Sequence, residues 1–438
     1  MIETDTKNDI AFAKKGYKQT KLGLIPEGWS TPIIAEVFEF LSTTSFSRNQ
    51  LNYEEENDIF YIHYGDIHAT YKTPILDFGR NKNVPKLNID IILPATVQYL
   101  KDGDVIIADA SEDYEGVGTA IELKNIGEKK VLSGLHTFAL RDKDGLTVEG
   151  FRTYIFKNPF VKKALKTIAT GSKVFGISKG NIQKFKIVLP PLPEQQKIAS
   201  ILSTWDNAIA AQEKLIAQKQ ALKKGLMQQL LTGKRRFPGF EEEWIKTELR
   251  DIGTIIRGAS PRPKGDSRYY GGNVPRLMVK DVTRDGKYVT PKIDFLTEAG
   301  AIKSRPCKAG TLTIVCSGDV GVPSFLAVDA CIHDGFLAII DIKSNLIHSD
   351  FLYYQLKRLR TRMERSATHG GVFTNLTTTI LKDFIIEIPP LKEQLLIINV
   401  LAKTDREVDK QEIKLEKIIR QKRGLMQMLL TGEKRVKI

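Results

Sequence analysis

The chain repeats one long element, and this repeat constrains its fold more than any other feature. PPLPEQ beginning at Pro190 returns as PPLKEQ beginning at Pro389, and GLMQQLLTGKRR beginning at Gly225 returns as GLMQMLLTGEKR beginning at Gly424. Both pairs of markers are the same number of residues apart, so the segments are copies of one element. A chain of 438 residues also exceeds the roughly 250–300 residues at which one hydrophobic core stops growing, so more than one domain is expected.

Each copy predicts a long helix. A proline pair followed by Glu-Gln opens it, and Thr-Gly with a basic cluster closes it, as at helix ends. Such a helix is about 57 Å long, too long for one domain to cover, so the two helices are expected to cover each other; two separately packed amphipathic helices are the alternative. Gln212 and Gln411 fall at the same slot and either fix the register or face solvent. Spaced 4-3-4-3, the apolar seam consists of Leu202, Trp205, Ile209, Ile216, Leu226, Leu230, Leu401, Val408, Leu415, Ile418, Leu425 and Leu429.

The segments before the helices predict two α/β (α+β) domains, because short β-rich runs, turns and a few helical stretches alternate in them. The domains end alike, with TGSKVFGI around Gly171 and THGGVFTN around Gly370, but otherwise their sequences scarcely resemble each other. The predicted order is an N-terminal extension (1–22), a first domain (23–189), a first helix (190–236), a second domain (237–388) and a second helix (389–438). This is a repeated scaffold that carries two different recognition surfaces.

Composition narrows the class of protein. A formal net charge of +14 favours an anionic partner such as nucleic acid, although much of the excess lies on the two helical segments. No apolar run approaches the length of a membrane span or of a secretion signal, so a cytoplasmic protein is expected. Three cysteines without CxxC spacing predict neither a disulfide framework nor a zinc site; Cys307, Cys316 and Cys331 are expected to be reduced core residues.

Six motifs carry a resemblance that covers nearly the whole chain: LGLIPEGW, LPPLPEQQKIASIL, LMQQLLTGKRRFPGF, RGASPRP, IPPLKEQ and LMQMLLTGEKR. In this order they are similar to the DNA-sequence-specificity subunits of type I restriction-modification enzymes. The resemblance implies two target recognition domains, separated by two long helices that form an antiparallel coiled coil with pseudo-two-fold symmetry. Each domain would bind one half of a bipartite asymmetric duplex DNA target. The first domain lacks a counterpart of RGASPRP, so the two half-sites should differ in sequence.

The resemblance also implies partners. The helices would set the spacer between half-sites and dock two methyltransferase subunits, through which restriction (translocase) subunits join. No catalytic centre, metal or cofactor is expected in this chain, because S-adenosylmethionine, ATP and magnesium would be bound by the partner subunits. Residue patterns agree: Asn158-Pro159-Phe160 lacks the second proline of a methyltransferase motif, and Gly171 and Gly176 lack the lysine of a P-loop.

DNA contacts require basic or hydroxyl side chains and backbone amides at turns. The two shared loops and a Pro/Gly-rich loop in the second domain meet this requirement, and a mixed aromatic and basic segment in the first domain meets it less clearly. A charged or structural surface loop is the alternative in each case. The candidate DNA-binding residues are Tyr64, His68, Tyr71, Lys72, Gly171, Ser172, Lys173, Arg257, Ser260, Arg262, Lys264, Arg268, Tyr269, Gly370 and Gly371.

Three rival hypotheses stay open at this point. Asp109 or Asp113 with Glu122 and Lys124 has the acid, acid-x-Lys pattern of a magnesium-dependent nuclease. A metal site is the second hypothesis. His and Asp side chains bind metal ions, and such side chains occur at His63, Asp66, His68 and His136, although these residues lack a tight ligand spacing. A coiled-coil scaffold that touches DNA only through its charge is the third.

Overall fold

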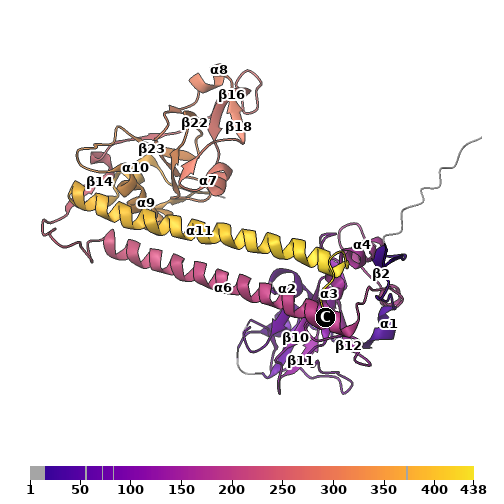
Figure 1. Cartoon of the computed structure of the whole chain (residues 1–438). Coiled ribbons are helices and arrows are strands. Elements are labelled where there is room, and N and C mark those ends of the chain that lie inside the picture. The colour runs from indigo at the N-terminus through magenta and orange to yellow at the C-terminus, as the bar shows by residue number, and fades with distance from the viewer. Residues whose placement is uncertain (1–14, 55–56, 72, 82, 371–372) are drawn as a thin grey trace, which may run out of the picture. The chain divides into compact units, whose positions relative to one another are not determined.

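The computed structural model describes residues 15–54, 57–71, 73–81, 83–370 and 373–438. The chain divides into two compact units, each described by itself below. Unit 1 comprises Met1–Glu213 with Lys414–Ile438, and unit 2 comprises Lys214–Ile413. The division cuts both long helices, α6 (Leu192–Leu230) and α11 (Leu391–Leu430) (Figure 1). Each unit therefore contains one α+β domain and about half of each helix.

The domain of unit 1 is built on a mixed five-stranded sheet in the order β3-β12-β8-β10-β6. Every pair is antiparallel except β10 with β6. Its central strand β8 is buried along its whole length, which explains the continuous apolar run in the sequence. The bounds are β3 (Phe38–Leu41), β12 (Thr137–Asp142), β8 (Val105–Ala108), β10 (Ala120–Lys124) and β6 (Ile75–Asp77).

A four-stranded sheet in the order β11-β5-β7-β4 completes this domain. These strands are β11 (Lys130–Ser133), β5 (Ile59–Ile62), β7 (Lys86–Leu87) and β4 (Leu51–Asn52). Two small pairs join β1 (Tyr17–Gln19) to β2 (Leu24–Pro26) and β13 (Phe175–Gly176) to β9 (Ala110–Ser111). Its helices are α1 (Ile34–Val37), α2 (Tyr64–Ala69), α3 (Arg152–Lys157), α4 (Pro159–Ile168) and α5 (Lys179–Gln183).

Unit 2 repeats the five-stranded sheet strand for strand, in the order β15-β23-β20-β21-β17, with the last pair parallel. Its four-stranded sheet has the order β18-β16-β22-β19. The strands are β15 (Thr254–Arg257), β23 (Phe336–Ile340), β20 (Leu312–Val315), β21 (Pro323–Leu326), β17 (Tyr288–Val289), β18 (Asp294–Leu296), β16 (Tyr270–Leu277), β22 (Ala330–Ile332) and β19 (Pro306–Cys307).

Two further strand pairs and four α-helices complete unit 2 among its described residues. They are the pairs β14 (Ile245–Glu248) with β26 (Ile385–Ile388) and β24 (Thr368–Gly370) with β25 (Phe373–Asn375), and the helices α7 (Val279–Asp285), α8 (Glu298–Ile302), α9 (Ser349–Ser366) and α10 (Thr378–Lys382). Cys307, Cys316 and Cys331 are buried and free, as expected, and burial raises the pKa of the Cys307 thiol to about 11.

The two long helices pair in the antiparallel sense inside each unit. In unit 1, Leu202 near the start of α6 shares a core cluster with Leu425 and Leu429 near the end of α11. In unit 2 the order is reversed, because Leu230 near the end of α6 lies in one cluster with Leu401 near the start of α11. Every residue of the predicted 4-3-4-3 seam is buried or half-buried. This is the helix pair that the repeat predicted, with two similar α+β domains.

Candidate nucleic-acid interface

Helix α2 of unit 1 presents two of the predicted residues beside strand β9. The helix begins after His63, whose Nδ1 accepts a hydrogen bond from Gly65 N at 3.1 Å. Tyr64 packs edge-on against His136, with ring centroids 5.4 Å apart, and His68 Nε2 lies 3.0 Å from the carbonyl oxygen of Ala110. Tyr64 is half-buried and His68 is exposed, so both offer part of their rings to a partner.

The loop around Gly171 reaches the same strand from the other end of the domain sequence. Thr170 and Gly176 exchange backbone hydrogen bonds of 2.9 and 2.8 Å, and β13 then pairs with β9. Gly171 has φ +133°, and a Cβ there would lie 1.9 Å from Val174 O, so this turn requires glycine. Ser172 and Lys173 are exposed at its tip. The fold therefore brings the helix α2 candidates and this loop together around β9.

Tyr71, a predicted residue of this segment, does not join that surface. Tyr71 is only 7% exposed and belongs to a hydrophobic core cluster, because the chain turns inward after α2. The prediction that Tyr71 contacts DNA is thus wrong for this structure: its aromatic ring is a core element. Lys72 lies outside the described residues.

In unit 2, Asp334 organises the start of the Pro/Gly-rich loop. Arg257 Nε donates to the Asp334 carbonyl at 3.1 Å, and Ser260 Oγ donates to the Asp334 carboxylate. Arg276 extends the network, since its guanidinium donates to Ser260 Oγ at 2.7 Å and pairs with Asp294 at 2.6 Å. Arg257 and Ser260 are therefore half-buried and held in place, more as supports of the loop than as free groups.

The outer part of this loop is exposed and basic. Arg262 is 72% exposed and lies 3.8 Å from Asp334, and Lys264 is also exposed. Arg268 pairs with Asp266 at 2.6 Å, which holds the pKa of Asp266 at about 2 and neutralises part of that arginine's charge. Tyr269 accepts a hydrogen bond from Lys303 at 2.7 Å. The structure thus brings Arg262, Lys264, Arg268 and Tyr269 into one basic loop.

Sequence reasoning missed Lys303 and Arg305, which are exposed beside this loop. Arg305 Nε donates to the carbonyl of Arg257 at 3.1 Å, and the Lys303 ammonium lies 4.5 Å from the centroid of the Tyr269 ring. Their separation along the chain from the loop left no local signal. The pairing of β19 with β22 and the hydrogen bond from Ser304 Oγ to the Ala259 carbonyl at 2.7 Å bring this segment close to the loop.

The second shared loop forms the hairpin of β24 and β25, in which Gly370 pairs with Phe373. Gly371 lies outside the described residues. Arg257 reaches Asn375 of this hairpin at 3.5 Å, and Ser317 bridges to Asn375. The hairpin and the basic loop of unit 2 are therefore linked through Arg257, as the two parts of the unit 1 surface are linked through β9.

The nuclease hypothesis fails on the position of Glu122. This carboxylate is 2% exposed and accepts hydrogen bonds from Gly150 N and, at 3.2 Å, from Thr153 N, so it supports the start of α3. Burial raises its pKa to about 7. Asp109 instead pairs with His136 at 3.3 Å.

The metal hypothesis fails on Asp66, which forms two 2.9 Å hydrogen bonds with Arg48. Within the described ranges, no group of three or more His, Cys, Asp or Glu side chains is placed to hold a metal ion. Asn158 caps α4 and donates to the carbonyl of Leu430, so its role is to join the domain to α11.

The repeated Glu of the proline-rich motif forms the same buried junction in each unit. Glu194 accepts from Trp29 Nε1 at 3.3 Å and pairs with Arg435. In unit 2, a glutamate (Glu393), a tryptophan (Trp244, 3.2 Å) and an arginine (Arg236, 2.8 Å) make the same arrangement. The sequence analysis identified these motifs as helix signals but missed the junction. Its signals were the Trp near the start of each domain and the basic cluster after each helix.

A second polar junction holds each domain to both helices. Tyr154 of α3 donates to Asp206 of α6 at 2.7 Å, and Lys422 of α11 pairs with Asp206. In unit 2 the corresponding set is Tyr354, Asp405 and Lys223, with a Tyr–Asp distance of 2.6 Å. Each domain therefore has a matching second polar anchor on the helix pair.

Comparison with known proteins agrees with this architecture. A type I restriction enzyme MjaVIII specificity subunit of Methanocaldococcus jannaschii is 27% identical over 453 residues, covering 97% of each chain. The EcoR124I/EcoR124II specificity subunit of Escherichia coli is 28% identical over 244 residues, which cover 52% of this chain and 57% of that one. A solved chain of a type I R-M system gives a TM-score of 0.60 at 19% identity, covering 94% of this chain and 99% of that one. At that identity the likeness concerns the fold alone.

Residues 26–219 and 241–418 match the type I restriction modification DNA specificity domain. The chain therefore belongs to the family of type I restriction-modification specificity subunits. It is the recognition component of such a system and carries no catalytic role of its own. No helix among the described residues is long and apolar enough to cross a membrane.

Proposed function

We propose that the domains at 23–189 and 237–388 are target recognition domains that bind the two unlike halves of a bipartite asymmetric duplex DNA target. The observation that carries this proposal is the shared five-stranded sheet with different side chains around it. One scaffold with two chemistries is what recognition of two different half-sites requires. Direct recognition depends on which side chains reach the base edges, so unlike surfaces select unlike sequences.

In unit 2 the exposed cations Arg262, Lys264 and Lys303 suit phosphates and guanine edges, and Tyr269 and Arg268 lie in the same loop. In unit 1 the surface around β9 offers Tyr64, His68 and Lys173 with the backbone of Gly171 and the hydroxyl of Ser172. Glu112, Asp113 and Glu115 also line the hollow beside α2. Acidic groups repel phosphate, so we place the first half-site's backbone on the Lys173 side of this hollow.

The helix pair completes the proposal. Both helices run through both units, so they set the spacing between the half-sites and dock two methyltransferase subunits. Restriction subunits join through the methyltransferase core, and S-adenosylmethionine, ATP and magnesium are bound by those partners. The assembly acts in the cytoplasm, where foreign DNA is met.

The test is selection of sites from a randomised duplex library by the complex of this chain with its methyltransferase subunits. The proposal predicts a split consensus whose two halves differ in sequence and are separated by a fixed number of unread base pairs. Uniform retention of all duplexes, weakened only by salt, would favour a scaffold that touches DNA through charge alone. A matched control is the methyltransferase subunit without this chain, which should select no site.

A further inference from the structure

A hydroxyl-rich segment of unit 1 stands where unit 2 has its basic loop. It follows β3, as the loop that begins at Arg257 follows β15, and both are the edge strands of their five-stranded sheets. Thr44 N donates to Ser133 O at 2.9 Å, and Ala259 N donates to Ile332 O at 3.0 Å. Ser133 and Ile332 are the last residues of β11 and β22, so the registers correspond. RGASPRP therefore has a structural counterpart in the first domain, although its sequence there is STTSFS.

The segment is held by one buried tyrosine. Tyr61 of β5 is fully buried, and its hydroxyl donates to Thr44 O at 2.9 Å and accepts from Phe46 N at 3.0 Å. The Phe46 ring lies edge-on to Tyr61, with centroids 5.6 Å apart. A fixed backbone lowers the entropy that a contact with a partner costs.

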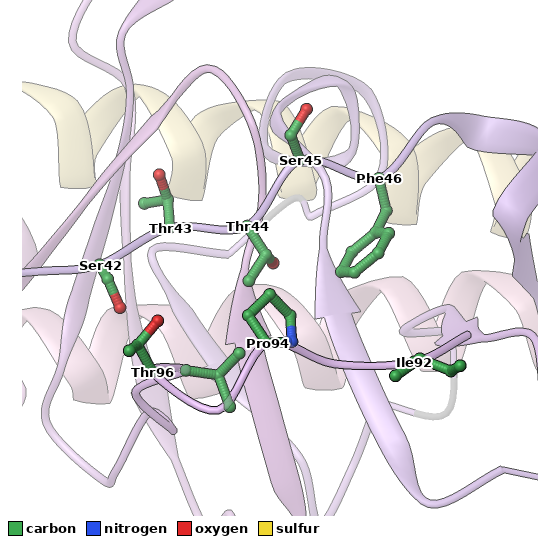
Figure 2. A pocket seen from close by; sticks show the side chains of 9 residues that line it. Ser42, Thr43, Thr44, Ser45, Phe46, Ile92, Pro94 and Thr96 are labelled. Carbon is green, nitrogen blue, oxygen red and sulfur yellow. The ribbon is translucent and has the colours of Figure 1, made fainter.

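The segment borders a small hollow of about 290 Å³ that Pro94 and Thr96 of the loop after β7 also line. Ser42 and Thr44 point toward Pro94 and Thr96, and Thr43 and Ser45 point away from them (Figure 2). The hydroxyl of Thr44 donates to Ser133 O at 3.2 Å. In the part of the chain that the structure describes, no hydrogen bond involves the hydroxyls of Ser42, Thr43 or Ser45. Ile92, at the edge of the hollow, is 91% exposed.

The hollow adjoins the surface already assigned to DNA. The same Tyr61 hydroxyl accepts from Leu135 N at 3.1 Å, and the next residue, His136, packs against Tyr64. A short path of direct contacts thus joins the hydroxyl segment to α2. In unit 2 the corresponding loop continues into the exposed cations Arg262 and Lys264.

We propose that Ser42, Thr43 and Ser45, with Ile92 beside them, form a second contact surface for the first half-site, one that binds DNA through hydroxyls and an apolar side chain without positive charge. This inference rests on the proposed function. Hydroxyls donate to phosphate oxygens and to base edges, and an aliphatic side chain contacts the methyl group of thymine. Because hydroxyls release no counterions, this surface contributes affinity that salt does not weaken, unlike the loop of unit 2.

The test uses the assembled complex with its methyltransferase subunits and its selected duplex. In Thr43→Ala/Ser45→Ala, affinity for the intact site should fall roughly 5- to 30-fold, as for lost hydrogen bonds to DNA, with the slope of log affinity against log salt unchanged. Ser45→Arg should instead steepen that slope by about one unit. Thr167→Ala, an exposed threonine on α4, is the matched control and should change neither quantity. Thermal unfolding verifies that each variant is folded.

The outcomes separate the two proposals. Wild-type affinity in the folded double variant, and an unchanged slope in Ser45→Arg, would overturn the inference and leave the bipartite recognition intact. Loss of affinity with a shallower slope would also overturn it, since charge would then be the source of binding. If the wild-type complex itself selects no split consensus, the proposed function fails. If the double variant relaxes one base position on reselection, the contact is to a base. If it loses affinity equally for all duplexes, the contact is to a phosphate. Either result supports the inference.

Discussion

The two recognition domains agree in the five-stranded sheet and differ in the four-stranded one. Both have three corresponding strands, β7-β5-β11 in unit 1 and β18-β16-β22 in unit 2, but the fourth strand joins at opposite edges, β4 beside β7 and β19 beside β22. The five-stranded sheets pack against the helices, whereas the basic loop of unit 2 and the hydroxyl segment of unit 1 connect the edge strand of the five-stranded sheet to the four-stranded sheet. The sheet that packs on the helices has the same strand order in both domains, and the four-stranded sheet does not.

The largest loss of folding stability is expected from breaking the Glu–Trp–Arg junction, which each unit contains once. Glu393→Ala leaves Arg236 and Trp244 without their carboxylate, and removing one partner of a buried pair costs on the order of 3 to 5 kcal/mol. Glu194→Ala should cost less, because its partner Arg435 is 45% exposed whereas Arg236 is 23% exposed. Denaturant unfolding measures both.

Glu407→Ala is the control for these variants, since its pair with Lys219 is 46% exposed on the carboxylate side and should contribute about 0 to 1 kcal/mol. Equal losses in all three variants would mean that the junctions are ordinary surface pairs.

A second comparison concerns one position in the five-stranded sheets. Glu122 of β10 and Phe325 of β21 pair with corresponding residues, Val105 and Leu312, so only unit 1 carries an acid there. Burial raises the pKa of Glu122 to about 7, and the folded state therefore holds a proton that the unfolded chain has lost above about pH 4.5. This stabilisation is present below about pH 4.5 and is lost as the pH rises through 7, a change on the order of 3 kcal/mol.

Protection of β8 and β10 against hydrogen exchange should accordingly fall as the pH is raised from 5 to 8, once intrinsic rates are removed, while β20 and β21 show no such trend. Glu122→Gln should flatten the dependence in unit 1. A parallel trend in both units would assign the effect to some other group.

The third prediction separates the two half-sites. Arg262→Ala or Lys264→Ala should impair recognition of one half-site only, by about 1 to 3 kcal/mol with one relaxed position if the contact is to a base, or with a salt slope lower by about one unit if it is to a phosphate. Lys246→Ala, an exposed lysine on β14, is the control. Equal loss of discrimination at both half-sites would show that the domains do not act independently.

The smallest change in stability is expected when a whole heptad is inserted into each long helix, which changes the distance between the domains' binding sites on DNA. Seven residues added after Lys214 and seven after Lys414 fall where the two units divide, keep the seam in phase and lengthen each helix by about 10 Å. The selected spacer should grow by up to about three base pairs, at roughly 3.4 Å each, with both half-site sequences unchanged. Insertions of three or five residues should damage assembly instead, because they rotate the seam. An unaltered spacer in an active heptad variant would contradict the proposal that the helices set the distance between the half-sites.

Much of the fold could be predicted because it repeats. The helices, their seam and the similar domain ends all follow from markers at equal separation. The candidate site was predicted only in part. Tyr71 looked like a surface aromatic because its neighbours are polar, and only the packing of the chain after α2 buries it. The hydroxyl segment at Ser42 has no charge or motif, so its position could be found only from the strand register it shares with Arg257.

Unit 1 is discontinuous in the chain, whereas unit 2 is one continuous stretch, Lys214–Ile413. During synthesis the partners of Glu194 and Asp206 in the first unit, Arg435 and Lys422, emerge from the ribosome only after the whole of the second unit. The apolar stripe of α6 around Leu202 waits for Leu425 and Leu429 in the same way. The half of the protein that is translated first is therefore the last to be completed, and its exposed stripe needs protection for about the second half of translation.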